Sequence, residues 1–214
     1  MKDKKKINSY DPYEEKWNVY THAFGLLLSI VGFFLLVSKA VSDGGVLRIV
    51  SFSIFGASLI ILYLASTLFH NSKDIEKRKQ LNIFDHASIY ILIAGSYTPF
   101  TLVTLHGTLG WVIFGIVWSI ALIGVILKLF YTGRFKNAST IAYVLMGWIV
   151  MFAINSIIDN LSVEGFYWLL AGGISYTIGA LLYSFQKIKY NHAIFHVFVL
   201  LGSFCHYITI YYYV

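Results

Sequence analysis

Gly110–Phe130 reads GWVIFGIVWSIALIGVILKLF, and the 18 residues from Gly110 to Leu127 include no charged side chain. A helix needs about 20 predominantly apolar residues to cross the ~30 Å hydrocarbon core of a bilayer. Apolar residues follow one another here without the period-2 alternation of a barrel strand. The stretch therefore predicts a transmembrane α-helix.

The composition of the whole chain agrees with a membrane environment. Apolar residues make up 58% of the 214 residues and charged residues only 12%, with a mean hydropathy of +0.72. Soluble domains carry about 25% charged residues, so this chain has too few for an ordinary water-facing surface. The single cysteine, Cys205, excludes an internal disulfide framework. We therefore predict an all-α integral membrane protein.

Six further apolar stretches resemble the first in length and composition. Short breaks separate them, so consecutive helices are expected to pack as antiparallel neighbours. Residues 1–17 form a predicted cytoplasmic basic leader, and residues 18–214 a single seven-helix transmembrane domain. The predicted spans are Asn18–Ala40, Val46–His70, Asn82–Thr104, Gly110–Phe130, Thr140–Ile157, Phe166–Phe185 and His192–Val214.

The positions of the basic residues predict the orientation. Fourteen of the 16 Lys and Arg residues lie in or beside the leader and the breaks after the second, fourth and sixth spans. Because cytoplasmic loops are enriched in Lys and Arg, the N-terminus is predicted to be cytoplasmic and the C-terminus outside, which requires an odd number of spans. The net charge of +6 is thus a topology signal in a multi-pass protein of the bacterial plasma membrane. No nucleic-acid partner is expected.

A cleaved signal peptide is the competing interpretation of the N-terminal region. Lysines precede an apolar run there, and Ser38-Lys39-Ala40 is a weak small-x-small site whose cleavage would leave a chain that starts at Val41. The run has full spanning length and more spans follow it, which favours a retained first helix.

Ionisable side chains within the spans point to function, because hydrocarbon penalises them unless they are paired or solvated. With the predicted orientation, the second span ends at the cytoplasmic side with His70, and the third begins there with Asp85 in its first turn. The seventh span begins at the same side with His192, and His196 lies one turn deeper. Three distant segments thus bring four polar residues to one layer.

The spacing of these residues predicts a zinc site. His192-Ala-Ile-Phe-His196 is an i,i+4 pair, so both imidazoles project from one helix face. Such a pair supplies two zinc ligands, and His70 would complete the three protein ligands of a catalytic site. Ser66 shares a helix face with His70, and Asp85 supplies a carboxylate that could orient a ligand or activate bound water.

Less specific interpretations stay open for several of these residues. An i,i+4 histidine pair also occurs by chance, and interfacial histidines often only hydrogen-bond at headgroup depth. His86 points about 100° away from Asp85 and is expected at the interface, whereas His206 lies roughly 21 Å along the helix from His192. His106 is expected in an outer loop. His22 is expected either to pack against neighbouring side chains or to donate a hydrogen bond to a metal ligand.

The same residues carry a family resemblance that covers the chain from Trp17 onward. Ser66-x3-His70, Asp85 and His192-x3-His196 resemble the progestin and adipoQ receptor superfamily, and in particular its bacterial branch, the hemolysin III proteins. The segments Asn18-Val-Tyr-Thr-His22-Ala-Phe-Gly and Gly95-Ser-Tyr-Thr-Pro99 are similar to that branch.

The resemblance implies a seven-helix bundle with a zinc ion near its cytoplasmic side. It implies that His70, His192 and His196 are the ligands, with Ser66 and Asp85 close to the water that the zinc binds. Related adiponectin receptors and alkaline ceramidases look like lipid amide hydrolases, and bacterial members are connected with membrane-lipid homeostasis.

Two functions follow as hypotheses. The first is a zinc-dependent hydrolase of a ceramide-like lipid amide or ester, with membrane lipids as substrate or ligand. The alternative is a non-enzymatic, zinc-stabilised membrane protein that senses lipid order or acts as a hemolysin with cytolytic activity.

Overall fold

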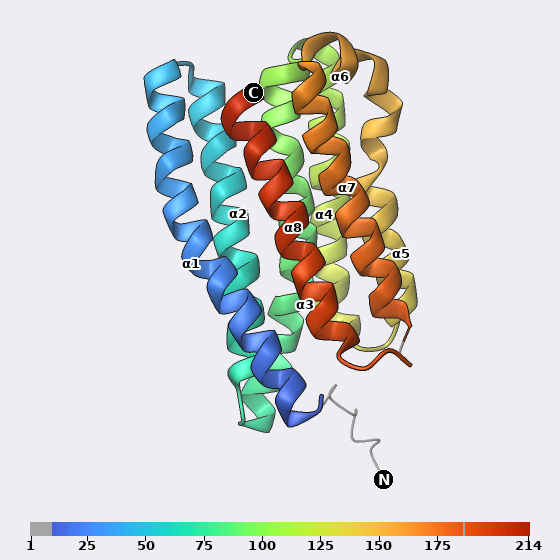
Figure 1. Ribbon diagram of the computed structural model, residues 1–214. Helices are drawn as coiled ribbons and strands as arrows, with labels where there is room; N and C mark the ends of the chain where they lie inside the picture. The colour runs from blue at the N-terminus through green and yellow to red at the C-terminus, as the bar shows by residue number, and fades with distance from the viewer. Residues whose placement is uncertain (1–9, 186) are drawn as a thin grey trace.

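The computed structural model describes residues 10–185 and 187–214, which form an all-helical bundle (Figure 1). In this part of the chain seven helices are long and apolar enough to cross a membrane, as the sequence predicts. The first two spans are α1 Pro12–Asp43 and α2 Val46–Asn71, and the third is α3 Ile75–Pro99 continued by the π-helix η1 Phe100–Leu105. The fourth is α4 Gly107–Tyr131, and the fifth consists of α5 Lys136–Gly147, the 3-10 helix η2 Ile149–Ala153 and α6 Ile154–Asn160. The last two are α7 Val163–Ser184 and α8 Asn191–Tyr213.

The first four spans pack in sequence, α5 packs against α3 and α7 rather than closely against α4, and α8 closes the bundle against both α7 and α1. The third span, α3 with η1, is the most deeply buried of the seven. The start of α1 and the turns that join α2 to α3, α4 to α5 and α7 to α8 lie at one end, drawn at the bottom of Figure 1. We call this the site end. It brings together segments that are up to about 180 residues apart in sequence.

Close approach of α7 and α8 depends on small residues. A Cβ atom at Gly172 would lie 2.2 Å from His206 Cδ2, and one at Gly179 would lie 2.8 Å from Phe198 Cβ. Glycine at these positions allows the two backbones to approach each other, as is common between membrane helices.

Helix α1 begins before the predicted first span. Pro12 stands in its first turn, and the Asp11 carboxylate accepts a hydrogen bond of 2.9 Å from the Tyr13 backbone N–H. An N-cap aspartate followed by proline favours a helix start at this position. Residues 12–17 of the predicted leader are therefore helical, and they extend α1 at the site end; residues 1–9 of the leader lie outside the described residues.

The fifth span includes the predicted Thr140–Ile157 and extends beyond it at both ends, but it is not one continuous helix. Between α5 and α6 the backbone passes through the 3-10 helix η2. The Tyr97 hydroxyl of α3 donates to the Gly147 carbonyl at 2.6 Å and accepts from the Val150 N–H at 2.9 Å. Backbone groups released by a helix break inside a membrane need such partners. Tyr97 therefore stabilises the interrupted span.

Candidate metal centre

Three histidines from two helices converge at the site end. His70 lies in the last turn of α2, while His192 and His196 occupy the first two turns of α8. The Nε2 atom of His192 lies 3.0 Å from Nε2 of His70 and 3.0 Å from Nε2 of His196. All three residues are buried, and their ligand atoms lie within 4.8 Å of one another. The convergence that the sequence predicts is confirmed.

Hydrogen-bond acceptors fix the tautomers of two of the rings. Nδ1 of His70 lies 2.6 Å from Glu15 Oε2, and Nδ1 of His196 lies 3.3 Å from the Asn18 carbonyl oxygen. A carboxylate or carbonyl oxygen can only accept, so both Nδ1 atoms carry the proton. The Nε2 lone pairs of His70 and His196 are then directed at the ring of His192.

This arrangement of lone pairs is suited to a cation. If His192 carried a proton on Nε2, it could donate to one neighbouring Nε2 but not to both. A metal ion accepts all three lone pairs at once, and a tetrahedral ion with Zn–N distances of about 2.0–2.1 Å separates its nitrogen ligands by about 3.3 Å. The three buried histidines can therefore hold a metal ion.

An ion pair between α1 and α3 positions the His70 ring. Glu15 pairs through Oε1 with Arg78 while Oε2 contacts His70. Arg78 Nη1 in turn donates to the Phe69 and Ser72 carbonyl oxygens, at 3.1 and 3.2 Å, at the end of α2. A carboxylate that accepts from the remote N–H of a ligating imidazole orients the ring and raises its basicity.

Two residues near the N-terminus, Glu14 and Tyr10, contact His192. Glu14 Oε1 accepts from the His192 backbone N–H at 3.1 Å, where a carboxylate complements the positive end of the α8 dipole. The Tyr10 ring stacks on the His192 imidazole with centroids 4.5 Å apart, and its hydroxyl lies 3.2 Å from Nδ1. Burial raises the pKa of the Tyr10 phenol well above its usual value, so the hydroxyl stays neutral and can accept from Nδ1–H.

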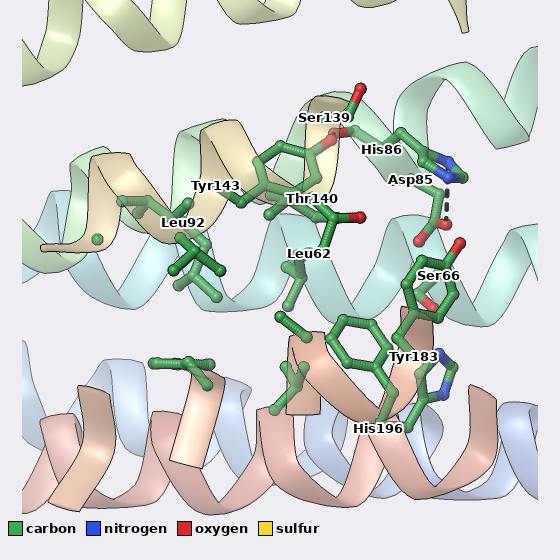
Figure 2. Close-up of a pocket in the computed structure, with 18 of the residues that line it drawn as sticks. Leu62, Ser66, Asp85, His86, Leu92, Ser139, Thr140, Tyr143, Tyr183 and His196 are labelled. Atoms are coloured by element: carbon green, nitrogen blue, oxygen red, sulfur yellow. Dashed lines mark hydrogen bonds and ion pairs between the residues drawn. The ribbon is translucent and has the colours of Figure 1, made fainter. Parts of the chain in front are cut away.

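A cavity of about 210 Å³ opens beside the histidines. Its wall includes Ser66 of α2 and Asp85 of α3 together with His192 and His196 (Figure 2). Ser66 Oγ is buried and has no hydrogen-bond partner among the described residues, so its hydroxyl is available to a ligand. Asp85 is also buried, and its Oδ2 atom lies 3.6 Å from His86 Nδ1. The structure thus brings both predicted catalytic residues to the pocket beside the histidine cluster.

The other four histidines lie outside the cluster, as expected. His86 lines the cavity next to Asp85, although it was expected at the interface (Figure 2). His206 stays outside the histidine cluster, as expected, but it lines the same elongated cavity. His22 is buried and stacks on His196 with ring centroids 3.4 Å apart, which is a packing role. His106 is exposed between η1 and α4.

Sequence reasoning missed the contributions of Tyr10, Glu14 and Glu15. These residues were assigned to the leader, because their polarity placed them before the first apolar run. The Asp11-Pro12 helix start followed by two acidic residues was the available signal, since it extends α1 to the depth of the histidines. Lys128 lines the cavity, whereas its position in the sequence indicated only a topology role.

Comparisons with known proteins find relatives that match nearly the whole chain. The family model described as "Haemolysin-III related" matches residues 10–207. "Hemolysin-3" of Bacillus cereus is 44% identical over 201 residues, which cover 94% of this chain and 92% of the relative. "Hemolysin-3 homolog" of Bacillus subtilis (strain 168) is 46% identical over 190 residues, or 89% of each chain.

Animal proteins are also similar to this chain, at lower sequence identity. The human "Monocyte to macrophage differentiation factor" is 31% identical over 207 residues, which cover 94% of this chain and 84% of the relative. The match extends over all seven apolar helices, so the likeness concerns the whole bundle. Together with the seven spans, these matches confirm the predicted resemblance: the chain belongs to the haemolysin-III-related family of multi-pass membrane proteins.

Proposed function

We propose that this protein is a zinc-dependent hydrolase of lipid amide or ester bonds. The observation that carries the proposal is that Ser66, Asp85 and two of the three clustered histidines line one cavity. Zinc is the metal that best suits three neutral imidazoles, because it accepts nitrogen ligands in a tetrahedral arrangement. Three protein ligands leave one position open, which is typical of catalytic rather than structural zinc sites.

Each polar side chain around the cavity would have a separate role in hydrolysis. When bound, zinc would lower the pKa of a water molecule toward neutrality and polarise the scissile carbonyl. Asp85 would accept the proton of the attacking water as general base. Ser66 would donate its free hydroxyl to the oxygen on which negative charge develops. Glu15 would hold the His70 ring in the ligating orientation through the 2.6 Å contact to Nδ1.

The cavity walls favour a lipid as the substrate. Apart from the polar groups described above, aliphatic side chains such as Leu62, Ile89, Leu92 and Val199 line it. Such a surface accommodates an acyl chain, and Ser66 and Asp85 lie at the histidine end of the cavity (Figure 2). A ceramide-like amide or a lipid ester combines these two requirements, so membrane lipids are the proposed partners.

We infer that the site end faces the cytoplasm and the C-terminus faces outside. The start of α1 and the turns after α2, α4 and α7 meet at this end. Fourteen of the 16 basic residues lie in or beside these turns, in the first turns of α1 or in the sequence before α1. The positive-inside rule assigns such an end to the cytoplasm.

A non-enzymatic role is the second candidate, and one feature favours it. The histidine cluster joins the end of α2 to the start of α8, so a bound zinc ion would cross-link two helices far apart in sequence. Metal bound only to the folded state would stabilise the bundle. In this case the protein would act by sensing lipid order or, as the names of its relatives suggest, as a hemolysin.

Hydrolysis of a defined lipid by the purified protein tests the proposal. We expect fatty-acid release from ceramide that stops with a zinc chelator and returns when zinc is added. About one zinc per chain is expected, with loss of metal in His70→Ala, His192→Ala and His196→Ala but not in the exposed control His106→Ala. Asp85→Asn should keep the zinc and lose activity by on the order of 100-fold or more.

The outcomes separate the two candidates. Zinc that is required for thermal stability, without hydrolysis of any lipid amide or ester, would support the non-enzymatic role. Undiminished activity in His192→Ala would exclude the zinc mechanism.

A further inference from the structure

A buried lysine lies on the far side of the cavity from the histidine cluster. Lys128 belongs to the last turn of α4 and is only 6% exposed, and it is the one buried Lys or Arg in the described part of the chain. Lysines near the end of a membrane helix usually extend toward water. Lys128 instead lines the cavity, where its ammonium group approaches α5.

The neighbours of Lys128 do not neutralise its charge. Its Nζ atom donates to Ser139 Oγ at 2.6 Å and lies 5.6 Å from the centroid of the Tyr143 ring. Ser139 Oγ in turn donates to the Phe135 carbonyl oxygen at 2.9 Å. No carboxylate among residues 10–185 and 187–214 forms an ion pair with Lys128. The ammonium group therefore has two N–H donors and a full charge available to a ligand.

Unpaired charges inside a membrane protein are costly and mark sites for ions or ligands. Four Lys and Arg side chains in the described part of the chain, Lys39, Arg48, Arg78 and Lys79, instead form ion pairs with acidic residues. Asp85 is the acidic residue of the cavity wall, and its ion-pair neighbour is His86. Figure 2 shows Ser139 and Tyr143 on α5 across the cavity from His196, so the lysine side is distinct from the histidine side.

Taken as a whole, the cavity wall is largely apolar. Leu62, Ile89 and Leu92 lie along it, and Val144 extends this surface on α5. A free inorganic anion would leave this surface without a partner, whereas an acyl or alkyl chain would cover it. The ligand that satisfies both features combines an anionic group with a hydrocarbon chain.

We propose that Lys128, whose ammonium group is positioned by the 2.6 Å hydrogen bond to Ser139 Oγ, forms a binding site for the phosphate or carboxylate of an anionic lipid whose hydrocarbon chain occupies the cavity. The site lies outside the histidine cluster, and its occupancy requires neither a bound metal nor hydrolysis. The inference concerns binding, so it can be tested separately from the proposed activity.

Binding of dodecyl phosphate to the full-length protein in phosphatidylcholine nanodiscs tests this site. The protein is treated with a chelator, so that a phosphate–metal contact cannot contribute. We expect dodecyl phosphate to bind about tenfold or more tightly than dodecylphosphocholine, dodecanol or inorganic phosphate, because the charged hydrogen bond and the alkyl chain act together. Lys128→Met should abolish this preference, and Lys128→Arg should keep it.

Further variants distinguish ligand binding from a structural role of the lysine. Lys128→Gln keeps a hydrogen-bond donor for Ser139 but no charge, so it should lose binding as Lys128→Met does. Ser139→Ala keeps the charge and should retain most of the binding. Lys73→Met, which removes an exposed lysine at the same end, is the matched control and should bind as the wild type does.

Two results would overturn the proposal. One is equal affinity for dodecyl phosphate in the wild type and in folded Lys128→Met or Lys128→Gln. The other is competition by inorganic phosphate at the same concentration as dodecyl phosphate, which would indicate a site for a free anion.

Discussion

Glu15 Oε2 lies 2.6 Å from Nδ1 of His70, so a residue in the first turn of α1 sets the orientation of a metal-binding ring at the end of α2. The same carboxylate pairs with Arg78 at the start of α3. One acidic side chain thereby joins three helices at the site end. It determines which ring nitrogen of His70 faces the cluster.

Replacing Glu15 by glutamine should weaken metal binding without removing a ligand. The neutral amide is a poorer acceptor for His70 Nδ1–H and cannot pair with Arg78, so the imidazole is less basic and less well oriented. Loss of such a partner typically lowers metal affinity by about 10–100-fold. Competition with a chromophoric chelator measures the change. Glu76→Gln, which alters an exposed glutamate at the same end, should leave the affinity unchanged.

Replacing Ser66 by alanine should affect turnover rather than folding. The Ser66 hydroxyl has no hydrogen-bond partner among the described residues, so its removal breaks no internal bond. If it stabilises developing charge, the rate of lipid hydrolysis should fall on the order of 100-fold. The melting temperature and zinc content should stay at their wild-type values.

Ser58→Ala is the matched control for this variant. Ser58 is equally buried on α2, but its hydroxyl already donates to the Phe55 carbonyl oxygen at 2.7 Å. It should keep full activity. A Ser66→Ala protein that hydrolyses lipid at the wild-type rate would remove Ser66 from the mechanism.

Replacing Tyr97 by phenylalanine should destabilise the interrupted fifth span. The change removes the hydroxyl that bonds both the Gly147 carbonyl and the Val150 N–H, leaving two backbone groups without a partner. We expect the free energy of unfolding to fall by about 1–3 kcal/mol, measured by unfolding in detergent. Tyr90→Phe removes the hydroxyl of a buried tyrosine for which no hydrogen bond is found among the described residues, and it should cost less.

The predicted orientation can be tested with cysteines in a Cys205→Ser background. Lys73 lies in the turn between α2 and α3, whereas Asp159 lies at the opposite end of the bundle in α6. In intact cells a membrane-impermeant thiol reagent should label Asp159→Cys, and it should label Lys73→Cys only after permeabilisation. The reverse pattern would place the histidine cluster at the outer face.

Many features of the bundle follow from local sequence alone. The seven apolar stretches determine the number and approximate extent of the spans, because each is long enough to cross a bilayer by itself. The i,i+4 spacing of His192 and His196 places both rings on one helix face whatever the rest of the chain does. Chain direction then brings the end of α2 and the start of α8 to the same depth, which is why the histidine cluster could be predicted.

Other features depend on contacts between helices that no local pattern encodes. The sequence places Glu15 and Lys128 only at the ends of spans, since charged residues there usually face water. Tertiary packing instead directs Glu15 to His70 and Lys128 into the cavity. The break in the fifth span likewise requires Tyr97 from another helix to satisfy the released backbone groups. Hydrophobicity therefore determined the spans of this protein, whereas the pairing of its few buried polar groups was decided only by the packed bundle, because in hydrocarbon each such group needs a partner from a neighbouring helix.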